Sequence, residues 1–305
     1  MLRTILKLLV SAILFYFLLI NVDTDELMNR FSNLNAFTIA FAFVAMLPTV
    51  LLQAERFRRI ANLNSNIDFR SALTITWVGQ LFSQCLPSIM GGDAFRIWYL
   101  KRHNIGLRNG FLITLADRVI GFIALFFILL IGLPWLLGLT ENLMAQLLIC
   151  LMVSGGFGAW LGACYVDIAS RLLPEGWRSS RLLSLFWDVP VFLRRASMGF
   201  NPGLVGILFS MLGQVFQVLA TYILSHRVGL NPNFLTLLFF MPIANLSTML
   251  PLSIGGWGIR ELVLVSTLSA TGMNSADALT LSILTGLANL AVSLPGLFLW
   301  IAIRR

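Results

Sequence analysis

Long apolar runs with no charge or a single lysine constrain this 305-residue chain more than any other feature. There are six, at about 5–22, 36–54, 119–138, 143–166, 203–224 and 278–303. Each is long enough to cross the roughly 30 Å hydrocarbon core of a bilayer as a helix. With 58% hydrophobic and 11% charged residues, the chain cannot form one ordinary soluble domain. The run at 5–22 lacks a small-x-small cleavage site, so we expect it to be a retained span rather than a signal peptide.

One phrase occurs twice in register, LPSIMGGDAFR at 86–96 and LPLSIGGWGIR at 250–260. The offset is 164 residues, and Leu, Pro, Gly-Gly and Arg match in both copies. Each copy places a helix-breaking Pro, a flexible Gly pair and a charge at the end of an apolar stretch. Paired interruptions of this kind in the two halves of a chain indicate a transporter binding site.

The apolar stretches that precede the phrase, 71–90 and 234–254, are predicted to enter the membrane and return on the same side. With a cytoplasmic N-terminus, this topology leaves only Arg30, Arg227 and Arg260 outside, whereas two full crossings would move most basic residues outside. The positive-inside rule therefore favours re-entrant hairpins and a cytoplasmic C-terminus.

The same offset carries span 36–54 onto 200–218 and span 119–138 onto 283–302. We therefore predict an all-α polytopic membrane protein with six full spans and two re-entrant helical hairpins, arranged as an inverted internal repeat. Repeat A covers about 36–138 and repeat B about 200–303, within one integral membrane domain, 1–305. A gene duplication retained for packing alone is the alternative explanation.

Acidic and basic residues occur together at four places near membrane depth, where an unpaired charge costs about 2.5 to 3.5 kcal/mol on insertion scales. These are Glu55-Arg56, Asp93 with Arg96, Asp117-Arg118 and Arg260-Glu261. The pattern indicates charge-compensated networks around a polar cavity. The alternative is that these side chains lie at the interface and extend to water.

Uncharged polar side chains interrupt both re-entrant stretches. Gln80 and Gln84 share a helical face in the first, and Asn245 lies in the second. They predict a hydrated pathway at the same membrane depth in the two halves of the chain. Hydrogen bonds between packed helices would use the same residues.

The remaining features exclude several classes of function. The segment 167–200 alternates Arg with Leu, Phe and Trp, which predicts an interfacial amphipathic segment that attracts anionic lipid head groups. The net charge of +8 belongs to this surface, and no nucleic-acid-binding module is visible. Two isolated histidines, three unpaired cysteines and the absence of a P-loop indicate neither a metal nor any other cofactor.

The motifs Gly91-Gly92-Asp93 with Arg96, Asp117-Arg118 and GGWGIRE at 255–261 resemble the lysylphosphatidylglycerol synthase transmembrane region, also called the flippase-like domain. The resemblance covers about 5–303. It implies a polytopic protein of the bacterial inner membrane that moves a lipid between leaflets, as the membrane part of the multiple peptide resistance factor does for aminoacylated phosphatidylglycerol. By resemblance, Asp93, Arg96, Arg118, Arg260 and Glu261 occupy the polar motif positions. The chain ends at Arg305 without a soluble aminoacyl-transferase domain, so aminoacyl transfer is not expected.

These observations favour a lipid translocase over an enzyme. Arg56, Arg96, Arg118 and Arg260 are expected to bind phosphate, with Asp93 and Glu261 holding them when the site is empty. The pairs Gly91-Gly92 and Gly255-Gly256 are expected to allow close backbone approach and hinge movement. An anionic phospholipid or a polyprenyl-phosphate glycolipid is the expected substrate, because an inside-negative potential favours outward movement of an anion.

Two alternatives remain open. One is an intramembrane transferase that uses a lipid-linked donor, with Asp93, Asp117 or Glu261 as general base. The other is a non-catalytic scaffold for an envelope glycosyltransferase or synthase, which would depend on the 167–200 surface rather than on the buried charges.

Overall fold

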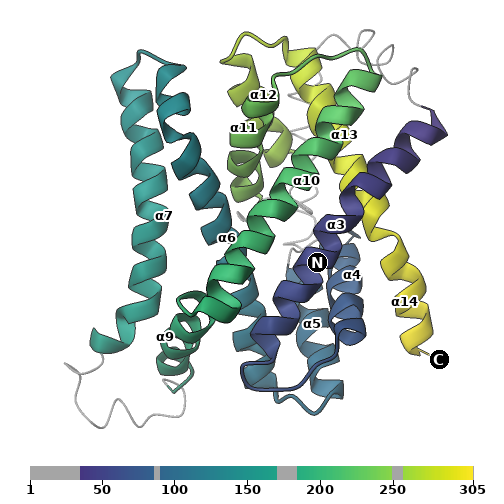
Figure 1. Ribbon diagram of the computed structural model, residues 1–305, viewed down its shortest axis with the longest axis vertical. Coiled ribbons are helices and arrows are strands. Elements are labelled where there is room, and N and C mark those ends of the chain that lie inside the picture. Colours follow the sequence, from purple (N-terminus) through teal and green to yellow (C-terminus); the bar gives the residue numbers. More distant parts are fainter. Residues whose placement is uncertain (1–34, 86–89, 170–183, 249–256, 305) are drawn as a thin grey trace, which may run out of the picture. The chain divides into compact units, whose positions relative to one another are not determined.

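A computed structural model of the protein describes residues 35–85, 90–169, 184–248 and 257–304. These residues are helical with short connections, and no strand occurs among them. The elements are α3 (Ala36–Ala61), α4 (Phe69–Cys85), α5 (Met90–Arg102), α6 (Leu107–Gly138), α7 (Leu143–Ala169), α9 (Ser184–Ser197), η2 (Phe200–Leu204), α10 (Val205–Arg227), α11 (Phe234–Ser247), α12 (Ile259–Ser269), α13 (Ser275–Ser293) and α14 (Pro295–Arg304) (Figure 1).

Five helical segments of the described chain are long and apolar enough to cross a membrane. They are 37–61, 107–138, 143–168, 200–227 and 275–303, and each contains most or all of one predicted span. The predicted span 5–22 lies outside the described residues. The protein is thus an all-helical, multi-pass membrane protein.

Two of the predicted spans differ from the observed helices. The helix α6 begins at Leu107, so Asp117 and Arg118 lie well inside it rather than at its start. The predicted span 278–303 is divided at Leu294 into α13 and α14, because Pro295 lacks a backbone N–H and its ring crowds the preceding turn.

The predicted re-entrant stretches overlap the short helices α4 and α11, which end at Cys85 and Ser247 and are followed by α5 and α12. These four helices have between 11 and 17 residues. At about 1.5 Å per residue, none reaches the roughly 30 Å needed to span the hydrocarbon core. α11 and α12 pack against each other. The start of α5 packs back on the end of α4, where Phe82 and Phe95 make an edge-to-face contact at 5.4 Å.

The helix boundaries follow the 164-residue offset of the repeated phrase. Shifting the first residues of α3, α4, α5 and α6 by 164 gives 200, 233, 254 and 271. The corresponding elements η2, α11, α12 and α13 begin at 200, 234, 259 and 275. The two halves of the chain therefore have the same order of helices with nearly the same spacing.

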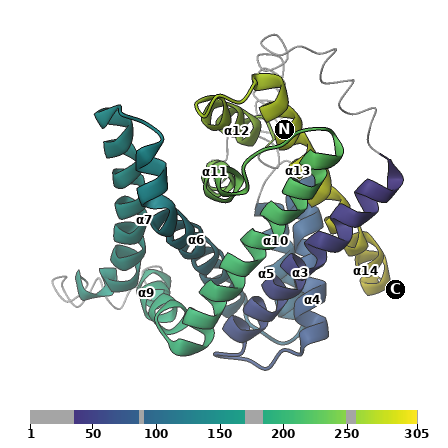
Figure 2. The ribbon, with the colours of Figure 1, turned by 45° about the horizontal axis from the view of Figure 1, so that its top comes forward.

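The chain divides into two compact units, and neither is one of the predicted repeats. The first unit contains the described parts of 1–51, 73–95 and 212–305, and the second contains 52–72 and the described parts of 96–211. The first unit contains residues from both halves of the chain. The Trp77 indole in the first half connects them by donating a hydrogen bond to the Val292 carbonyl in the second half (2.7 Å). In the second unit, α6 and α7 run side by side and α9 packs on both (Figures 1 and 2).

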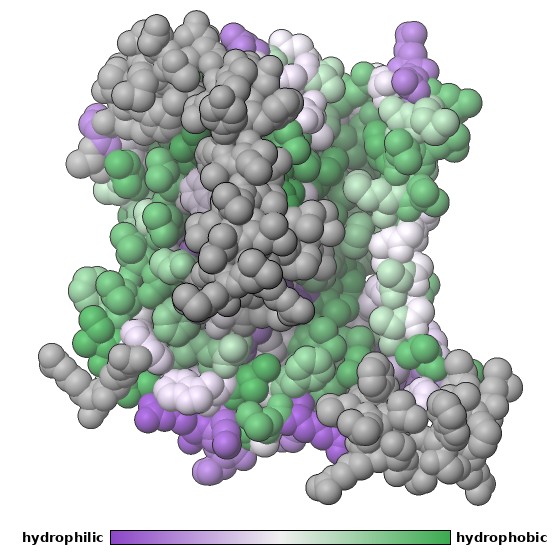
Figure 3. Space-filling view, turned by 180° about the vertical axis from the view of Figure 1, so that it is seen from behind, coloured by the Kyte–Doolittle hydropathy of each residue, from purple (hydrophilic) through white to green (hydrophobic). Residues whose placement is uncertain are grey.

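Apolar side chains face outward along the long helices. Leu143, Leu147 and Leu151 on α7 recur every four residues and are more than half exposed. Such a stripe would be a liability in water but is suited to lipid tails. On the face shown in Figure 3, hydrophobic residues likewise cover most of the described surface, and hydrophilic residues lie mainly at the top and bottom of the view.

Candidate functional site

Two arginines share one carboxylate inside the second unit. The Arg56 Nε donates to Asp117 Oδ1 (2.7 Å), and the Arg96 Nη1 donates to Asp117 Oδ2 (3.1 Å). The side chains of Arg56, Asp117 and Arg96 are only 10%, 3% and 13% exposed. We call these three residues the Asp117 cluster. They come from α3, α6 and α5, so three separate helices have to pack correctly to form it.

Small residues make room for the Arg56 side chain. A Cβ at Gly121 would lie 3.3 Å from Arg56 Nη1, and a Cβ at Gly206 would lie 3.3 Å from its Cγ. The Arg56 Nη1 also donates to Ser210 Oγ (2.6 Å). Glycines on α6 and α10 thus let a long side chain lie between the helices while keeping its guanidinium beside Asp117.

The Asp117 cluster carries one more positive than negative charge. Each guanidinium has five N–H donors, and the observed bonds use two of Arg56 and one of Arg96. The Arg96 Nε is buried and has no hydrogen-bond partner among the described residues. Burial of charge in a low-dielectric interior strengthens attraction for a compensating anion. The cluster can therefore accept a phosphate oxygen without losing Asp117 as its anchor.

The charge pairs differ from those expected from adjacency in the sequence. Arg56 bonds Asp117 rather than Glu55, and Glu55 instead accepts from Arg58 and Arg59 (2.7 and 2.8 Å). Arg96 also bonds Asp117. Arg56 and Arg96 are thus each paired with a carboxylate, although not with the one next to them in the sequence. Arg118 is half-buried next to Asp117 in the sequence of α6.

The second buried ion pair lies in the first unit and follows the prediction. Glu261 is fully buried and pairs with Arg260. It also accepts from the Gly258 backbone N–H (2.6 Å) and from Ser282 Oγ (3.3 Å). Gly258 precedes and caps α12 with a φ of 94°, a conformation that glycine adopts without a Cβ clash. Glu261 is therefore a helix-capping carboxylate as well as the counter-ion of Arg260.

Arg260 is enclosed on several sides. Its guanidinium lies 4.8 Å from the centre of the Trp257 ring, and its Nη2 lies 3.5 Å from the Ser282 carbonyl oxygen. A Cβ at Gly286 would lie 2.4 Å from the same Nη2. Since Glu261 neutralises its charge, this pair is a weaker anion site than the Asp117 cluster.

Four amide side chains form a hydrogen-bonded set in the first unit. The Asn245 Nδ2 donates to Gln214 Oε1 (3.1 Å) and Gln217 Oε1 (3.2 Å), and the Gln217 Nε2 donates to Asn289 Oδ1 (3.4 Å). We call these four residues the amide network. Asn245 was predicted as a site residue, whereas the other three were not. The sequence signal that could have identified the other three residues is an amide side chain inside an otherwise apolar span.

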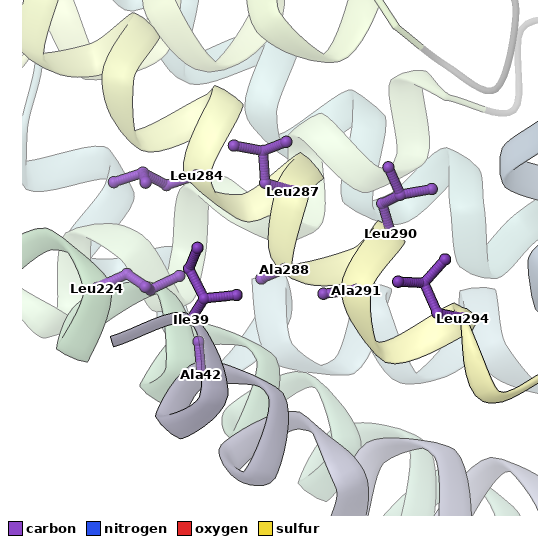
Figure 4. A pocket seen from close by; sticks show the side chains of 9 residues that line it. All are labelled: Ile39, Ala42, Leu224, Leu284, Leu287, Ala288, Leu290, Ala291 and Leu294. Carbon is purple, nitrogen blue, oxygen red and sulfur yellow. The ribbon is translucent and has the colours of Figure 1, made fainter. Parts of the chain in front are cut away.

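An apolar cavity of about 230 Å³ also lies in the first unit (Figure 4). Aliphatic side chains from α3, from α10 and from α13 with its C-terminal cap line it: Ile39, Ala42, Leu224, Leu284, Leu287, Ala288, Leu290, Ala291 and Leu294. A polar group would lose its hydrogen bonds to water there without replacement. A hydrocarbon chain is the kind of ligand that this lining can accept.

Comparison with known proteins identifies the family. Residues 4–296 match the family described as the Lysylphosphatidylglycerol synthase TM region. The chain belongs to this family. It is also similar to a UPF0104 membrane protein of Methanothermobacter thermautotrophicus, with 22% identity over 97% of this chain and 92% of that protein. The match confirms the family resemblance seen in the sequence motifs and associates the chain with membrane lipids.

In this member of the lysylphosphatidylglycerol synthase TM family, one motif glycine has a packing role. A Cβ at Gly92 would lie 2.1 Å from Ser83 Oγ and 2.2 Å from the Gly79 carbonyl oxygen. Gly92 thus allows α5 to pack closely on α4. Gly91 and Asp93 are half-buried at the start of α5, whereas Gly255 and Gly256 lie outside the described residues.

The other polar residues predicted on α4 lie at helical spacing. Gln80 and Gln84 are half-buried, and the Oε1 atom of each is fully buried without a hydrogen-bond partner among the described residues. In the basic segment 167–200, Arg194 donates two bonds to Asp167, at 3.0 and 2.7 Å. On α9, Phe192 and Leu193 are buried while Arg195 is exposed, and residues 170–183 of the predicted interfacial segment lie outside the described residues.

Proposed function

We propose that this protein moves a phosphate-bearing lipid between the leaflets of a membrane, with the Asp117 cluster as the phosphate site. The observation that carries the proposal is the sharing of one buried carboxylate by Arg56 and Arg96. Guanidinium matches phosphate oxygens in a planar, bidentate geometry. An arriving phosphate takes up the remaining donors and balances the excess positive charge, while Asp117 keeps both arginines in place when the site is empty.

The surroundings of the two buried carboxylates, Asp117 and Glu261, favour a binding role over a catalytic one. Both oxygens of Asp117 accept from arginine, and Glu261 accepts from Arg260, Gly258 and Ser282. A general base has to accept a proton from its substrate instead. These contacts support an anchoring role, so a non-enzymatic translocator is the function that we propose.

The tail of the lipid is expected to remain in an apolar environment while the head group crosses. When the inside of the membrane is negative by about 100 mV, moving one negative charge outward is favourable by about 2.3 kcal/mol. An anionic phospholipid or polyprenyl-phosphate lipid therefore needs no ATP to leave the inner leaflet, and this is the substrate class that we propose.

We propose that the helices form an inverted repeat with two re-entrant hairpins, α4–α5 and α11–α12. Their short lengths and the shared helix spacing of the two halves support this arrangement. So does the bond from Thr49 Oγ1 to the Gly213 carbonyl (3.1 Å), since these residues are exactly one offset of 164 apart. Equivalent residues meet in this way close to a pseudo-two-fold axis. Alternating access would then follow from movement of one repeat against the other.

Cysteine labelling at position 98 tests this topology, because Trp98 is 40% exposed on α5. In a variant with Cys85, Cys150 and Cys164 replaced, Trp98→Cys should react with a membrane-impermeant maleimide in inside-out vesicles but not in intact cells. Arg227→Cys, which is exposed at the end of α10, should show the opposite pattern. Labelling of position 98 from outside only would contradict the re-entrant topology and the cytoplasmic orientation of both termini.

Lipid flipping in proteoliposomes tests the function itself. The assay compares fluorescent phosphatidylglycerol, aminoacylated phosphatidylglycerol and a polyprenyl phosphate. Arg96→Ala should slow the flipping of the anionic lipids about 10- to 100-fold, the effect of losing charge-assisted hydrogen bonds. Arg96→Lys, which keeps the charge but loses the planar fork, should fall in between.

The matched control for this experiment is Arg194→Ala, since Arg194 is paired with Asp167 outside the Asp117 cluster. It should flip lipid like the wild type. Wild-type flipping by Arg96→Ala, with correct insertion, would remove the phosphate assignment. Faster movement of the cationic aminoacylated lipid than of the anionic ones would overturn the proposed substrate class.

A further inference from the structure

A polar cavity of about 300 Å³ lies in the second unit and shares no lining residue with the Asp117 cluster. Three elements form it: the turn that follows α3, the first two turns of α6, and α9. We call it the α6–α9 cavity. Its lining residues are Asn64, Arg108, Asn109, Leu112, Asp188, Val191, Phe192 and Arg195.

The α6–α9 cavity has an apolar floor and a polar rim. Its residues on α9 stand at i, i+3, i+4 and i+7, which is one face of a helix, and α9 packs on α6. Leu112 and Phe192 are 5% and 4% exposed, whereas Arg108 and Arg195 are exposed. A ligand can therefore reach the two guanidinium groups from water and place an uncharged part against the floor.

The rim carries one more positive than negative charge. Arg108 pairs with Asp188, and this ion pair joins the start of α6 to α9. Arg195 adds a second guanidinium, and Asp188 is the only carboxylate in the lining. The helix α6 adds partial positive charge, because its N-cap is Gly106, which has no side chain to cap the first N–H groups. The electrostatics of the rim thus favour an anion.

The turn that carries Asn64 is held in shape by its own hydrogen bonds. The Ile67 N–H donates to Asn62 Oδ1 (2.7 Å), and the Asn62 Nδ2 donates to the Ile67 carbonyl (3.2 Å). Asn64 is exposed in the middle of this turn, and Asn109 is half-buried on α6. Each amide can donate two hydrogen bonds. Neutral donors therefore flank the two arginines on a rim that is already formed.

We propose that the α6–α9 cavity binds the phosphate group of a small phosphate ester. Guanidinium groups match phosphate oxygens in a planar, bidentate geometry, so Arg195 and Arg108 hold the phosphate while Asn64 and Asn109 donate from the rim. Asp188 keeps Arg108 in place, and the organic part of the ester lies on the apolar floor. This site is separate from the Asp117 cluster, and the inference does not rest on the proposed function.

Thermal unfolding of the purified full-length protein in a neutral detergent tests the proposal. The melting temperature is followed against glycerol 3-phosphate, with glycerol as the control and the ionic strength held constant with chloride. A ligand that binds only the folded state raises the melting temperature with a concentration dependence that gives its Kd. We expect saturable stabilisation by glycerol 3-phosphate and none by glycerol.

Arg195→Gln should raise the Kd about 10- to 100-fold, the effect of losing charge-assisted hydrogen bonds. The matched control is Lys101→Gln, which removes the same charge from an exposed position in the last turn of α5 outside the cavity lining. It should bind like the wild type. Stabilisation that survives Arg195→Gln, or that weakens equally in both variants, would overturn the proposal.

Asn64→Asp provides a second variant that leaves α9 untouched. It puts a negative charge on the rim and should also raise the Kd at least ten-fold, because like charges repel. If Arg195→Gln does not fold, a wild-type Kd in Asn64→Asp would overturn the proposal by itself.

A lipid arm identifies the source of the phosphate. Dioctanoyl phosphatidic acid carries the same phosphomonoester on a lipid. Arg195-dependent stabilisation by glycerol 3-phosphate supports a soluble ligand, and stabilisation of that kind by phosphatidic acid alone supports a lipid head group at the same site. No Arg195-dependent stabilisation by either compound would overturn the phosphate assignment.

Discussion

An Asp117→Asn variant should be destabilised by about 3–5 kcal/mol, the typical effect of removing one partner from a buried ion pair. Asp117 is the counter-ion of both Arg56 and Arg96, and all three side chains are at most 13% exposed. Its loss leaves two positive charges in a low-dielectric interior. Asn keeps the shape of the side chain, so the change reports charge rather than packing. The measurement is unfolding in detergent micelles by denaturant titration.

Glu55→Gln is a matched control for this experiment. Glu55 also bonds two arginines, Arg58 and Arg59, but those are 36% and 29% exposed. Partly exposed ion pairs contribute about 1 kcal/mol or less. Adding Arg96→Met to Asp117→Asn removes one uncompensated charge and should recover part of the stability. Equal losses for Asp117→Asn and Glu55→Gln would show that the Asp117 cluster is not desolvated.

The second large effect is expected for Glu261→Gln, also at about 3–5 kcal/mol. Glu261 is fully buried, compensates Arg260 and accepts the Gly258 N–H at the start of α12. Gln retains an acceptor for Gly258 but leaves Arg260 without a counter-ion. Unfolding in detergent again provides the measurement, supplemented by the reactivity of a cysteine placed on α12.

A double variant distinguishes the electrostatic effect from loss of the helix cap. Arg260→Met in the Glu261→Gln background removes the uncompensated charge, so stability should rise above that of Glu261→Gln alone. The exposed Glu141 between α6 and α7 gives the control, since Glu141→Gln should change stability by about 0.5 kcal/mol or less. No recovery in the double variant would assign the loss to the cap alone.

The long apolar helices could be predicted because their uncharged runs are continuous in the sequence. The start of α6 could not be predicted, because Asp117 and Arg118 resemble the polar residues that usually mark the end of a membrane span. Asp117 is tolerated inside the helix by Arg56 and Arg96, which lie far away in the sequence. Long-range charge compensation of this kind leaves no local pattern, so the predicted partners were the sequence neighbours.

The site residues were predictable to a similar extent. The repeated phrase pointed to Arg96 and Arg260, and the acid–base pairing of neighbours pointed to Glu261; all three are buried or nearly so. Gly258-x-x-Glu261 could have been read as a helix start with a capping carboxylate. Gln214 and Gln217 were missed because two amides within one apolar span do not lower its hydropathy enough to attract attention. Their three-residue spacing on one helical face was the signal that was available.

The excess positive charge of the Asp117 cluster has an electrical consequence for a translocator. If the cluster changes its membrane exposure together with the lipid, a monoanionic head group makes the loaded site neutral, and the loaded step is insensitive to voltage. The empty site then carries a single positive charge on its return, which an inside-negative potential of about 100 mV draws inward with about 2.3 kcal/mol. The membrane potential would thus act by resetting the empty protein rather than by pulling on the lipid.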